Sequence, residues 1–465
     1  MFRLVHIFRL VPGVFLAVLA VLLPAAVSEA AAPGTVRVVL ERDAADFGFK
    51  VTGNYQLVDL STGRILSDLK PGTVWQVRQN GSRMELRGGG DRLGPFRGPV
   101  AVREARFHIG IISGSGDQVE KYSREDLVVL GGDGRPVVLE RTQPAVCSAG
   151  GTAALAGVAE GLQLVALTGS GGTTRYRGDM EFQVENGALV AINELHIEDY
   201  LRGVVPREMP AGWPEEALKA QAVAARNYAL QRVEATRGSS YNVTGDQLSQ
   251  VYGGYDAESP ATSRAVEATR GLVMECGGRL ITAFFHSSSG GSTENAEDVW
   301  ENPVPYIRGR EDPYDKNDRY YDWRVEYTAD QLAGQLRSYD EDEDYDFAEV
   351  DDLEELARTA SGLRVEKMAV TGTDSGGRSV RTVIAPADKV RFALGLRSAM
   401  FDLDKVYDRD GNLSGVVITG SGWGHGLGMS QWGARGMAEQ GYNFQDILEY
   451  YYTGIRLDSG YGRSS

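Results

Sequence analysis

The most restrictive feature of this sequence is a carboxylate enclosed by two prolines just ahead of a helical pattern. Pro206 and Pro210 bracket Arg-Glu-Met, with Glu208 at the centre. Proline fixes its own backbone and restricts the residue before it, so this stretch is not expected to be ordinary helix interior. We therefore expect Glu208 to lie on a constrained loop.

The segment after this loop has the pattern of a helix with one closely packed face. Pro214 suits the first helical position, and Glu215 and Glu216 complement the positive end of the helix dipole. The apolar positions that recur on one face are mostly small: Leu218, Ala222, Ala225 and Ala229. Lys219 and Arg226 fall together on a different face. A cationic face beside a lone carboxylate indicates a functional site.

The first residues have the order of a secretory signal peptide. Arg3 and Arg9 precede an apolar run over residues 14–23, and small residues follow it. The run is short for a membrane span, so the expected signal peptide covers residues 1–30 and is the only segment expected to meet a membrane. Export to the periplasm, the cell wall or the extracellular space follows from this prediction.

Charge and cysteine content limit the partners and the chemistry. The net charge of −16 argues against nucleic acid, because phosphate backbones need a basic surface. Cys147 and Cys276 are the only cysteines. In an exported protein they either pair or remain isolated thiols, and the sequence leaves both open.

The pattern along the chain predicts an α+β protein of two domains. Short alternating runs separated by Gly, Asp, Asn and Pro predict a β-rich N-terminal domain over residues 33–175. A mixed α+β domain is expected over residues 176–457, with the helix directly after the Glu-Met-Pro loop. Its first strands turn at Asn186-Gly187, and an acidic insertion lies near residues 338–356.

Five ordered segments give the sequence a family resemblance. They are the Glu-Met-Pro loop with its Ala-rich helix, GDQLSQVYGG (245–254), the Ala-Thr-Arg-Gly turn (268–271), AFFHSSSGGSTENAEDVW (283–300) and GWGHGLGMSQWGARGMAEQGYN (422–443). Together they resemble the sporulation stage II protein D family and the related amidase enhancers of bacterial cell walls. The resemblance covers roughly the C-terminal three-fifths of the chain.

The resemblance implies a lytic transglycosylase that cleaves peptidoglycan between N-acetylmuramic acid and N-acetylglucosamine. Glu208 would be the acid, in surroundings that raise its pKa, and the sugar's own 6-hydroxyl would close a 1,6-anhydro ring. A second protein carboxylate is then unnecessary. An ordinary muramidase would need one, with Asp199, Glu215 and Glu216 as candidates. A non-catalytic enhancer of a cell-wall amidase shares the same motifs and remains the alternative function.

Further residues follow from the same motifs. Lys219 and Tyr321 are expected to assist catalysis, although the neighbouring Tyr320 leaves the tyrosine register open. The residues expected to bind the glycan are Arg226, His286, Ser287, Trp423, His425, Gln431 and Trp432. Tryptophan faces suit sugar rings, and the glycines around His425 permit close backbone approach. A structural role is the alternative for each histidine.

No cofactor is expected. Some relatives hold zinc with the histidine that corresponds to His286 and with nearby cysteines, but no cysteine follows Cys276 here. Zinc held by other ligands, such as Glu294 or Asp298, is the remaining alternative. A serine hydrolase is disfavoured because the sequence lacks a Gly-x-Ser-x-Gly elbow.

Overall fold

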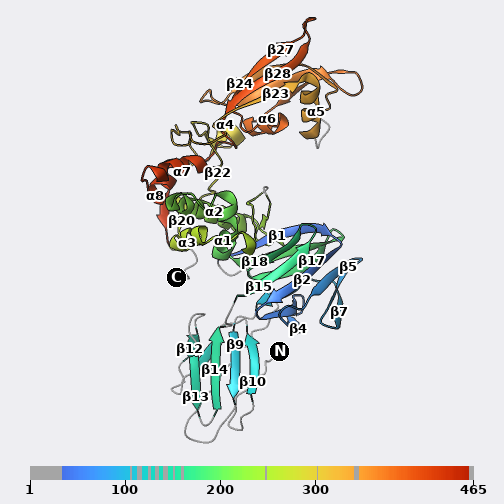
Figure 1. Ribbon diagram of the computed structural model, residues 1–465, viewed down its shortest axis with the longest axis vertical. Helices are drawn as coiled ribbons and strands as arrows, with labels where there is room; N and C mark the ends of the chain where they lie inside the picture. The colour runs from blue at the N-terminus through green and yellow to red at the C-terminus, as the bar shows by residue number, and fades with distance from the viewer. Residues whose placement is uncertain are drawn as a thin grey trace. The chain divides into compact units, whose positions relative to one another are not determined.

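The computed structural model describes residues 34–104, 162–246, 249–300, 302–339 and 345–459, and between residues 107 and 158 it describes the strands alone. The protein is α+β, with strands dominating its first part and most helices following residue 197, as the sequence predicts (Figure 1). The expected signal peptide lies outside the described residues. The chain forms two compact units, Met1–Val204 with Ala235–Glu258 and Val205–Glu234 with Ser259–Ser465.

The first unit contains a seven-stranded sheet with the order β19-β1-β18-β17-β8-β3-β4. Its strands are β1 (Thr35–Ala44), β3 (Tyr55–Asp59), β4 (Arg64–Leu69), β8 (Val100–Glu104), β17 (Asp179–Glu185), β18 (Ala188–His196) and β19 (Val243–Thr244). Neighbouring strands are antiparallel except for β1 and β19, which are parallel. The 3-10 helix η1 (Tyr255–Ala257) follows β19 in this unit.

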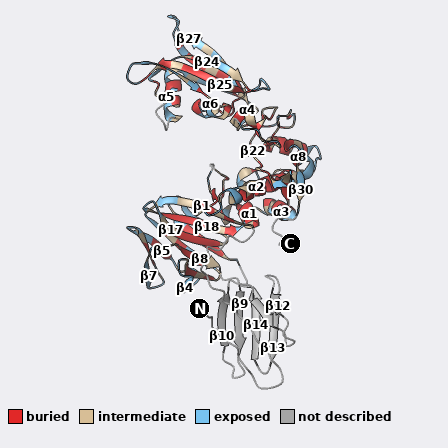
Figure 2. Ribbon diagram, turned by 180° about the vertical axis from the view of Figure 1, so that it is seen from behind, coloured by how far each residue is buried: buried red, intermediate tan, exposed pale blue. Residues whose placement is uncertain are grey.

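A six-stranded sheet packs against it in the order β16-β15-β2-β5-β6-β7. These strands are β2 (Asp46–Thr52), β5 (Trp75–Asn80), β6 (Arg83–Gly88), β7 (Asp91–Phe96), β15 (Leu164–Gly169) and β16 (Gly172–Tyr176). Phe182 of the first sheet lies 5.8 Å from Phe47 and 5.4 Å from Phe49 of the second, between ring centroids. The two sheets therefore share one core, and Figure 2 shows its buried residues on β17 and β18 in red.

The hairpin of β17 and β18 turns at Asn186 and Gly187, as predicted. Both turn residues have positive φ, 50° and 84°, which the tight hairpin turn requires. Strand β17 pairs with β8 and strand β18 pairs with β1, so this hairpin belongs to the first unit.

Six more strands lie between residues 107 and 158. They are β9 (Phe107–Ile112), β10 (Gln118–Ser123), β11 (Leu127–Leu130), β12 (Pro136–Leu139), β13 (Ala145–Ala149) and β14 (Thr152–Val158). They pair in the orders β10-β9-β14-β13 and β11-β12. Cys276 forms no disulfide with any side chain that the structure describes, and the side chain of Cys147, on β13, lies outside that part.

The second unit contains a helical core. Its helices are the end of α1 (Ile197–Glu208), most of α2 (Glu215–Ala235), and α3 (Pro260–Ala268), α4 (Ala296–Trp300), α7 (Gln431–Glu439) and α8 (Phe444–Tyr451). The accompanying strands pair as β21-β20-β30 and β22-β29: β20 (Val273–Cys276), β21 (Arg279–Leu280), β22 (Phe285–His286), β29 (Met429–Ser430) and β30 (Arg456–Asp458). Helix α2 lies where the sequence predicts it.

Two three-stranded sheets and two helices are inserted between α4 and α7. They comprise β23 (Asp322–Thr328), α5 (Ala329–Tyr339), β24 (Glu349–Arg358), β25 (Val365–Thr373), β26 (Ser379–Ile384), α6 (Ala387–Ala393), β27 (Phe401–Tyr407) and β28 (Leu413–Ser421). The sheets have the orders β23-β28-β27 and β24-β25-β26 and share one apolar cluster. Within the expected acidic insertion, residues 340–344 lie outside the described part, and β24 displays exposed carboxylates as an edge strand.

Helix α2 is buried far more completely than a single apolar stripe requires. Its buried residues occupy every face: Ala217, Leu218, Ala220, Gln221, Ala222, Val223, Ala224, Ala225, Arg226, Asn227, Ala229 and Leu230. Alanine allows neighbouring elements to approach on all sides, while Asn227 donates to the carbonyls of Met274 and Ile281. Among the described residues, no helix combines the length and apolarity needed to cross a membrane.

We predict that Ala224→Leu destabilises the protein by about 1–3 kcal/mol, because a fully buried alanine has no space for a larger side chain. Urea unfolding followed by circular dichroism measures the change. Ala235→Leu, at the exposed end of the same helix, is the matched control. Equal stability of the two variants would contradict the close packing around α2.

Candidate functional site

Glu208 is the last residue of helix α1, so the prediction of a loop around it was wrong. Pro206 lies inside the last turn of the helix. The Met209 N–H donates to the Val205 carbonyl at 2.9 Å, so helical hydrogen bonding continues past the proline. Pro206 lacks the N–H that would donate to the carbonyl one turn earlier, and the helix ends two residues after it. Arg207 is exposed and Glu208 is partly buried. The Glu208 carboxylate therefore lies partly covered at the C-terminal end of α1.

The loop after Glu208 anchors it to the core. Met209 is completely buried in the apolar cluster around α2. Trp213 donates its N–H to the Pro210 carbonyl at 2.9 Å, and Pro214 accepts from the first turn of α2. A tight turn therefore connects the carboxylate to the most buried helix of the unit.

An aromatic and cationic cluster forms beside this loop. The rings of Trp213 and Trp432 meet edge to face at 4.9 Å. The guanidinium of Arg435 lies over both rings, 5.3 Å from Trp213 and 4.8 Å from Trp432. The structure thus brings Trp432 on α7, a residue predicted to bind glycan, to the turn after Glu208. Trp213 and Arg435 join Trp432 in this cluster.

Lys219 is ion-paired within its own helix. Its Nζ lies 2.8 Å from a carboxylate oxygen of Glu216 and 3.0 Å from one of Glu215. Hydrogen bonding to Glu216 is the main reason that the pKa of Lys219 is raised. Glu216 also accepts the N–H of Phe444 at the start of α8. Lys219 therefore helps to join α2 to α8.

The expected cationic face of Lys219 and Arg226 does not exist. Arg226 is only 1% exposed and donates to the carbonyls of Val266 and Leu272, at the C-terminal end of α3. A guanidinium suits this negative helix end. The buried position of Arg226 corrects its prediction as a glycan contact, because α2 is covered on all sides.

The loop after His286 holds the two predicted tryptophans through its backbone. Strand β22 pairs in parallel with β29, which sets His286 opposite Ser430. The Ser287 carbonyl accepts from Trp432 N–H at 3.0 Å, and Ser288 exchanges two backbone hydrogen bonds with Trp423. Ser287 and Ser288 share one peptide unit, so the backbones of the tryptophans lie within about 10 Å of each other.

His286 is buried and His425 is partly buried, and their ring centroids lie 5.3 Å apart. Burial lowers the pKa of His286 well below its usual value, and the neighbouring His425 lowers it further. Burial also lowers the pKa of His425 to about 4. Nδ1 of His425 accepts the Leu427 N–H, so the neutral ring carries its proton on Nε2. Both histidines are neutral near pH 7.

The histidines and their neighbours do not fit a zinc site. Nε2 of His286 is buried without a hydrogen-bond partner in the described structure, and His425 lies beside it as a candidate second ligand. Among the residues with described side chains, no three His, Cys, Asp or Glu groups are close enough to share an ion. Glu294 pairs with Arg364, and Asp298 accepts from Asn295, so both alternative ligands are already bonded.

Two glycines in the 422–428 segment permit the close approach that the sequence predicts. Gly424 and Gly426 have φ of 120° and 81°. A Cβ on Gly424 would lie 2.6 Å from the His286 side chain, and one on Gly426 would lie 2.5 Å from the Arg364 guanidinium. Only glycine accepts both the positive φ and this contact.

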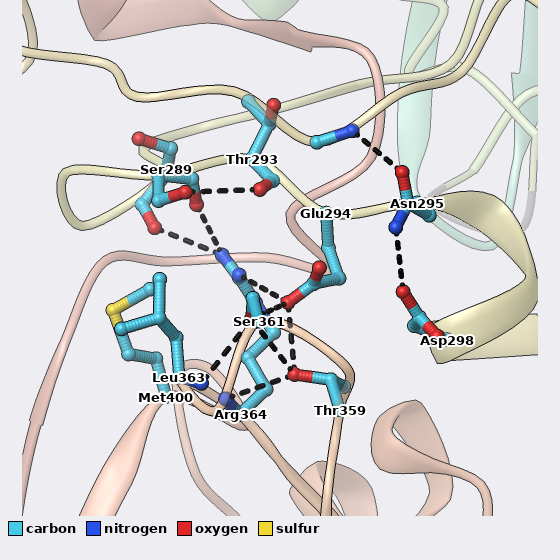
Figure 3. Close-up of polar contacts among 12 residues, drawn as sticks. Ser289, Thr293, Glu294, Asn295, Asp298, Thr359, Ser361, Leu363, Arg364 and Met400 are labelled. Carbon is cyan, nitrogen blue, oxygen red and sulfur yellow. Dashed lines mark hydrogen bonds and ion pairs between the residues drawn. The ribbon is translucent and has the colours of Figure 1, made fainter.

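A buried ion pair fastens the His286 loop to the inserted sheets (Figure 3). Arg364 and Glu294 are each 1% exposed, and their charged groups lie 3.4 Å apart. Arg364 also donates to the carbonyls of Ser289 and Ser292, while Glu294 accepts from Thr359 and Ser361. Sequence reasoning missed this pair, because the two residues are far apart in the chain and the motif around Glu294 suggests it only as an alternative zinc ligand.

A second buried group lies under the same loop. Oγ of Ser289 is 2.9 Å from a carboxylate oxygen of both Asp312 and Asp315. One hydroxyl carries one proton and cannot donate to both, so a proton held by the carboxyl pair is needed to complete the second hydrogen bond. Burial first, and then the charge of Asp315, raises the pKa of Asp312 to about 6. Tyr451 on α8 donates to Asp312 as well.

The remaining predicted residues lie around this loop. The hydroxyl oxygen of Tyr321 lies against Gly291, 2.8 Å from the position of a Cβ there, and burial raises the pKa of Tyr321. Gln431 is nearly buried, with its side-chain amide 3.3 Å from that of Gln221 on α2. Tyr320, not Tyr321, contacts Trp423.

We predict that Arg364→Met lowers stability by about 3–5 kcal/mol, because Glu294 would be left as an uncompensated buried charge. Adding Glu294→Gln should restore part of the loss. Arg381→Met, which breaks an exposed pair with Glu354, should cost no more than about 1 kcal/mol. Thermal unfolding compares the three; a loss for Arg364→Met as small as that for Arg381→Met would show that the pair does not hold the loop.

We predict that the Asp312 carboxyl makes stability fall as pH rises. Its folded pKa of about 6 exceeds the roughly 3.9 of an unfolded chain, so its contribution is full below about pH 4 and is lost as pH rises through 6. Relative to Asp312→Asn, wild type should lose on the order of 2 kcal/mol between pH 4 and 7.

Urea unfolding across this pH range measures the difference between wild type and Asp312→Asn. Asp404→Asn changes an exposed carboxylate on β27 and serves as the control. If wild type and Asp312→Asn show parallel pH profiles, the buried pair does not share a proton.

Comparison with known proteins agrees with the sequence resemblance. The profile of the Stage II sporulation protein family (SpoIID) matches residues 185–275, and that of a domain of unknown function (DUF8618) matches residues 306–428. The second match covers both inserted sheets and the segment up to Gly428.

Three relatives illustrate the similarity. Stage II sporulation protein D of Bacillus subtilis (strain 168) is 31% identical over 307 residues, which cover 62% of this chain and 81% of the relative. The Amidase enhancer of the same organism is 34% identical, over 56% of this chain and 40% of the relative. An uncharacterized protein of Brachyspira hyodysenteriae (strain ATCC 49526 / WA1) is 32% identical, over 61% and 72%. The chain therefore belongs to the stage II sporulation protein D family.

Proposed function

We propose that this protein is an exported lytic transglycosylase that cleaves the glycan strands of peptidoglycan, with Glu208 as its acid and base. The observation that carries the proposal is a partly buried carboxylate at a helix end, followed by a turn that packs on the Trp213, Trp432 and Arg435 cluster. Relatives named for sporulation and for amidase enhancement support a role in cell-wall metabolism.

The proposed chemistry needs one carboxyl group. Protonated Glu208 gives its proton to the oxygen between N-acetylmuramic acid and N-acetylglucosamine as that C–O bond breaks. The resulting carboxylate takes the proton of the sugar's 6-hydroxyl, whose oxygen bonds to C1 and closes the 1,6-anhydro ring. The nucleophile belongs to the substrate, so proximity supplies much of the rate and Glu208 returns to its starting state.

The neighbouring carboxylates support a single-acid mechanism over a muramidase. Asp199 lies 3.8 Å from Arg202, and Glu215 and Glu216 both pair with Lys219. Each of these ion pairs holds its carboxylate against a cation of the same helix, Arg202 on α1 or Lys219 on α2. Each candidate for the second carboxylate is thus engaged by a cation.

The glycan in this proposal lies on the aromatic cluster beside Glu208. Trp213 and Trp432 provide ring surfaces for sugars, and Arg435, which pairs with Glu439 at 2.7 Å, stacks on both rings. Lys219 could reach substrate only in competition with Glu215 and Glu216, so we assign it the role of holding the N-terminus of α2. Ser287, Gln431 and the histidines would shape the site through the loops that carry them.

The second candidate function is a non-catalytic partner of a cell-wall amidase. The similarity to the Amidase enhancer favours it, since that relative's name describes stimulation of another enzyme. In both proposals the protein acts outside the cytoplasm on the cell wall, with peptidoglycan as a partner. The transglycosylase requires cleavage of glycan strands that depends on Glu208, whereas the amidase partner requires no cleavage.

We predict that Glu208→Gln lowers the rate of glycan-strand cleavage by roughly 100-fold or more, because glutamine cannot donate the required proton. Release of soluble fragments from purified glycan strands measures the rate, and circular dichroism checks that the variant folds. Glu234→Gln, on the exposed end of α2, is the matched control and should keep full activity.

Two outcomes would contradict the assignment. Full activity of Glu208→Gln would remove Glu208 from the mechanism. Failure of wild type to cleave any strand, together with stimulation of an added amidase, would favour the non-catalytic function.

A further inference from the structure

An exposed aromatic pair lies on the other side of the His286 loop from Trp432. Trp423 is 40% exposed, unusual for so large an apolar side chain, and Tyr320 meets its ring edge to face at 4.7 Å. Their positions are fixed by the backbone: Trp423 N–H donates to the Ser288 carbonyl at 2.8 Å, and Tyr320 N–H donates to Asp318 at 3.1 Å. The pair is therefore a preformed surface.

Two arginines stack on this aromatic pair. The guanidinium of Arg397 lies 4.6 Å from the Tyr320 ring centroid and 5.7 Å from that of Trp423, and the guanidinium of Arg319 lies 4.5 Å from Tyr320. The backbone also joins them, since Gly424 N–H donates to the Arg397 carbonyl at 2.9 Å. Arginine held on an aromatic face keeps its hydrogen-bonding edge available for a planar anion.

Neither arginine has a carboxylate partner within the described part of the chain, and Nε of Arg397 is buried without a hydrogen-bond acceptor. Nearby arginines behave differently: Arg324 pairs with Glu326, and Arg391 pairs with Asp388. Two arginines without a described carboxylate partner therefore stack on the same Tyr320 ring, in a chain whose net charge is −16.

We propose that Arg319, Tyr320, Arg397 and Trp423 form a second glycan subsite that binds a sugar carrying a carboxylate. The sugar ring would lie on Trp423, and its carboxylate would accept hydrogen bonds from the guanidinium groups. This inference rests on the proposed glycan function and deepens it. The backbones of Trp423 and Trp432 lie within about 10 Å of each other through the Ser287–Ser288 peptide, so one strand can contact both tryptophans.

The test measures binding without cleavage. In the Glu208→Gln background, fluorescence titration gives the affinity for soluble glycan strands with free lactyl carboxylates and for the same strands after the carboxylates are amidated. The Arg319→Gln/Arg397→Gln variant should bind the acidic strands about tenfold to a hundredfold more weakly and the amidated strands unchanged. Trp423→Leu should weaken binding to both, because it removes the ring surface.

Arg324→Gln is the matched control, because it removes a neighbouring exposed arginine that is already paired. Unchanged affinity of the double arginine variant for acidic strands would overturn the subsite. If the double arginine variant loses binding to a glycerol phosphate polymer but binds acidic strands unchanged, the subsite recognises phosphate and not a sugar carboxylate. If the double arginine variant loses binding to acidic strands but the wild type cleaves no strand, the subsite is confirmed and the proposed enzymatic activity is wrong.

Discussion

The candidate site depends on one buried guanidinium, that of Arg364. It pairs with Glu294 and donates to the carbonyls of Ser289 and Ser292, so a single side chain from the inserted sheets satisfies both ends of the loop that follows His286. Buried backbone carbonyls and a buried carboxylate are costly without donors, so this loop has one stable arrangement only when Arg364 is present. The inserted region is thereby a structural part of the site.

From this anchored loop the remaining geometry follows. Its backbone holds Trp432 on one side and Trp423 on the other, and Trp432 in turn packs on Trp213 in the turn after Glu208. The carboxyl pair of Asp312 and Asp315 supports the loop from below and ties it to α8 through Tyr451. Two aromatic and cationic surfaces, one beside Glu208 and one around Trp423, thus share a common support.

The sequence predicts the locally encoded parts of this architecture and fails where distant residues meet. Asn186-Gly187 and Pro214 specify a turn and a helix start through their own backbone preferences, so the β17–β18 hairpin and α2 are predictable. The two prolines predict a loop at Glu208, because their local restrictions do not reveal that α1 continues through Pro206. Helical periodicity predicts an exposed Arg226, because it does not reveal a helix that is covered on all sides. Arg364 and Glu294 lie 70 residues apart, and no local pattern signals their pairing.

The central claim is that Glu208 closes an anhydro ring without an activated water. Mass spectrometry of the fragments that wild type releases from glycan strands stripped of peptides tests it most directly. We expect fragments that end in 1,6-anhydro sugars and are lighter by one water than ordinary reducing ends. Fragments with water added at the cleaved bond would contradict the mechanism and assign the protein as a muramidase.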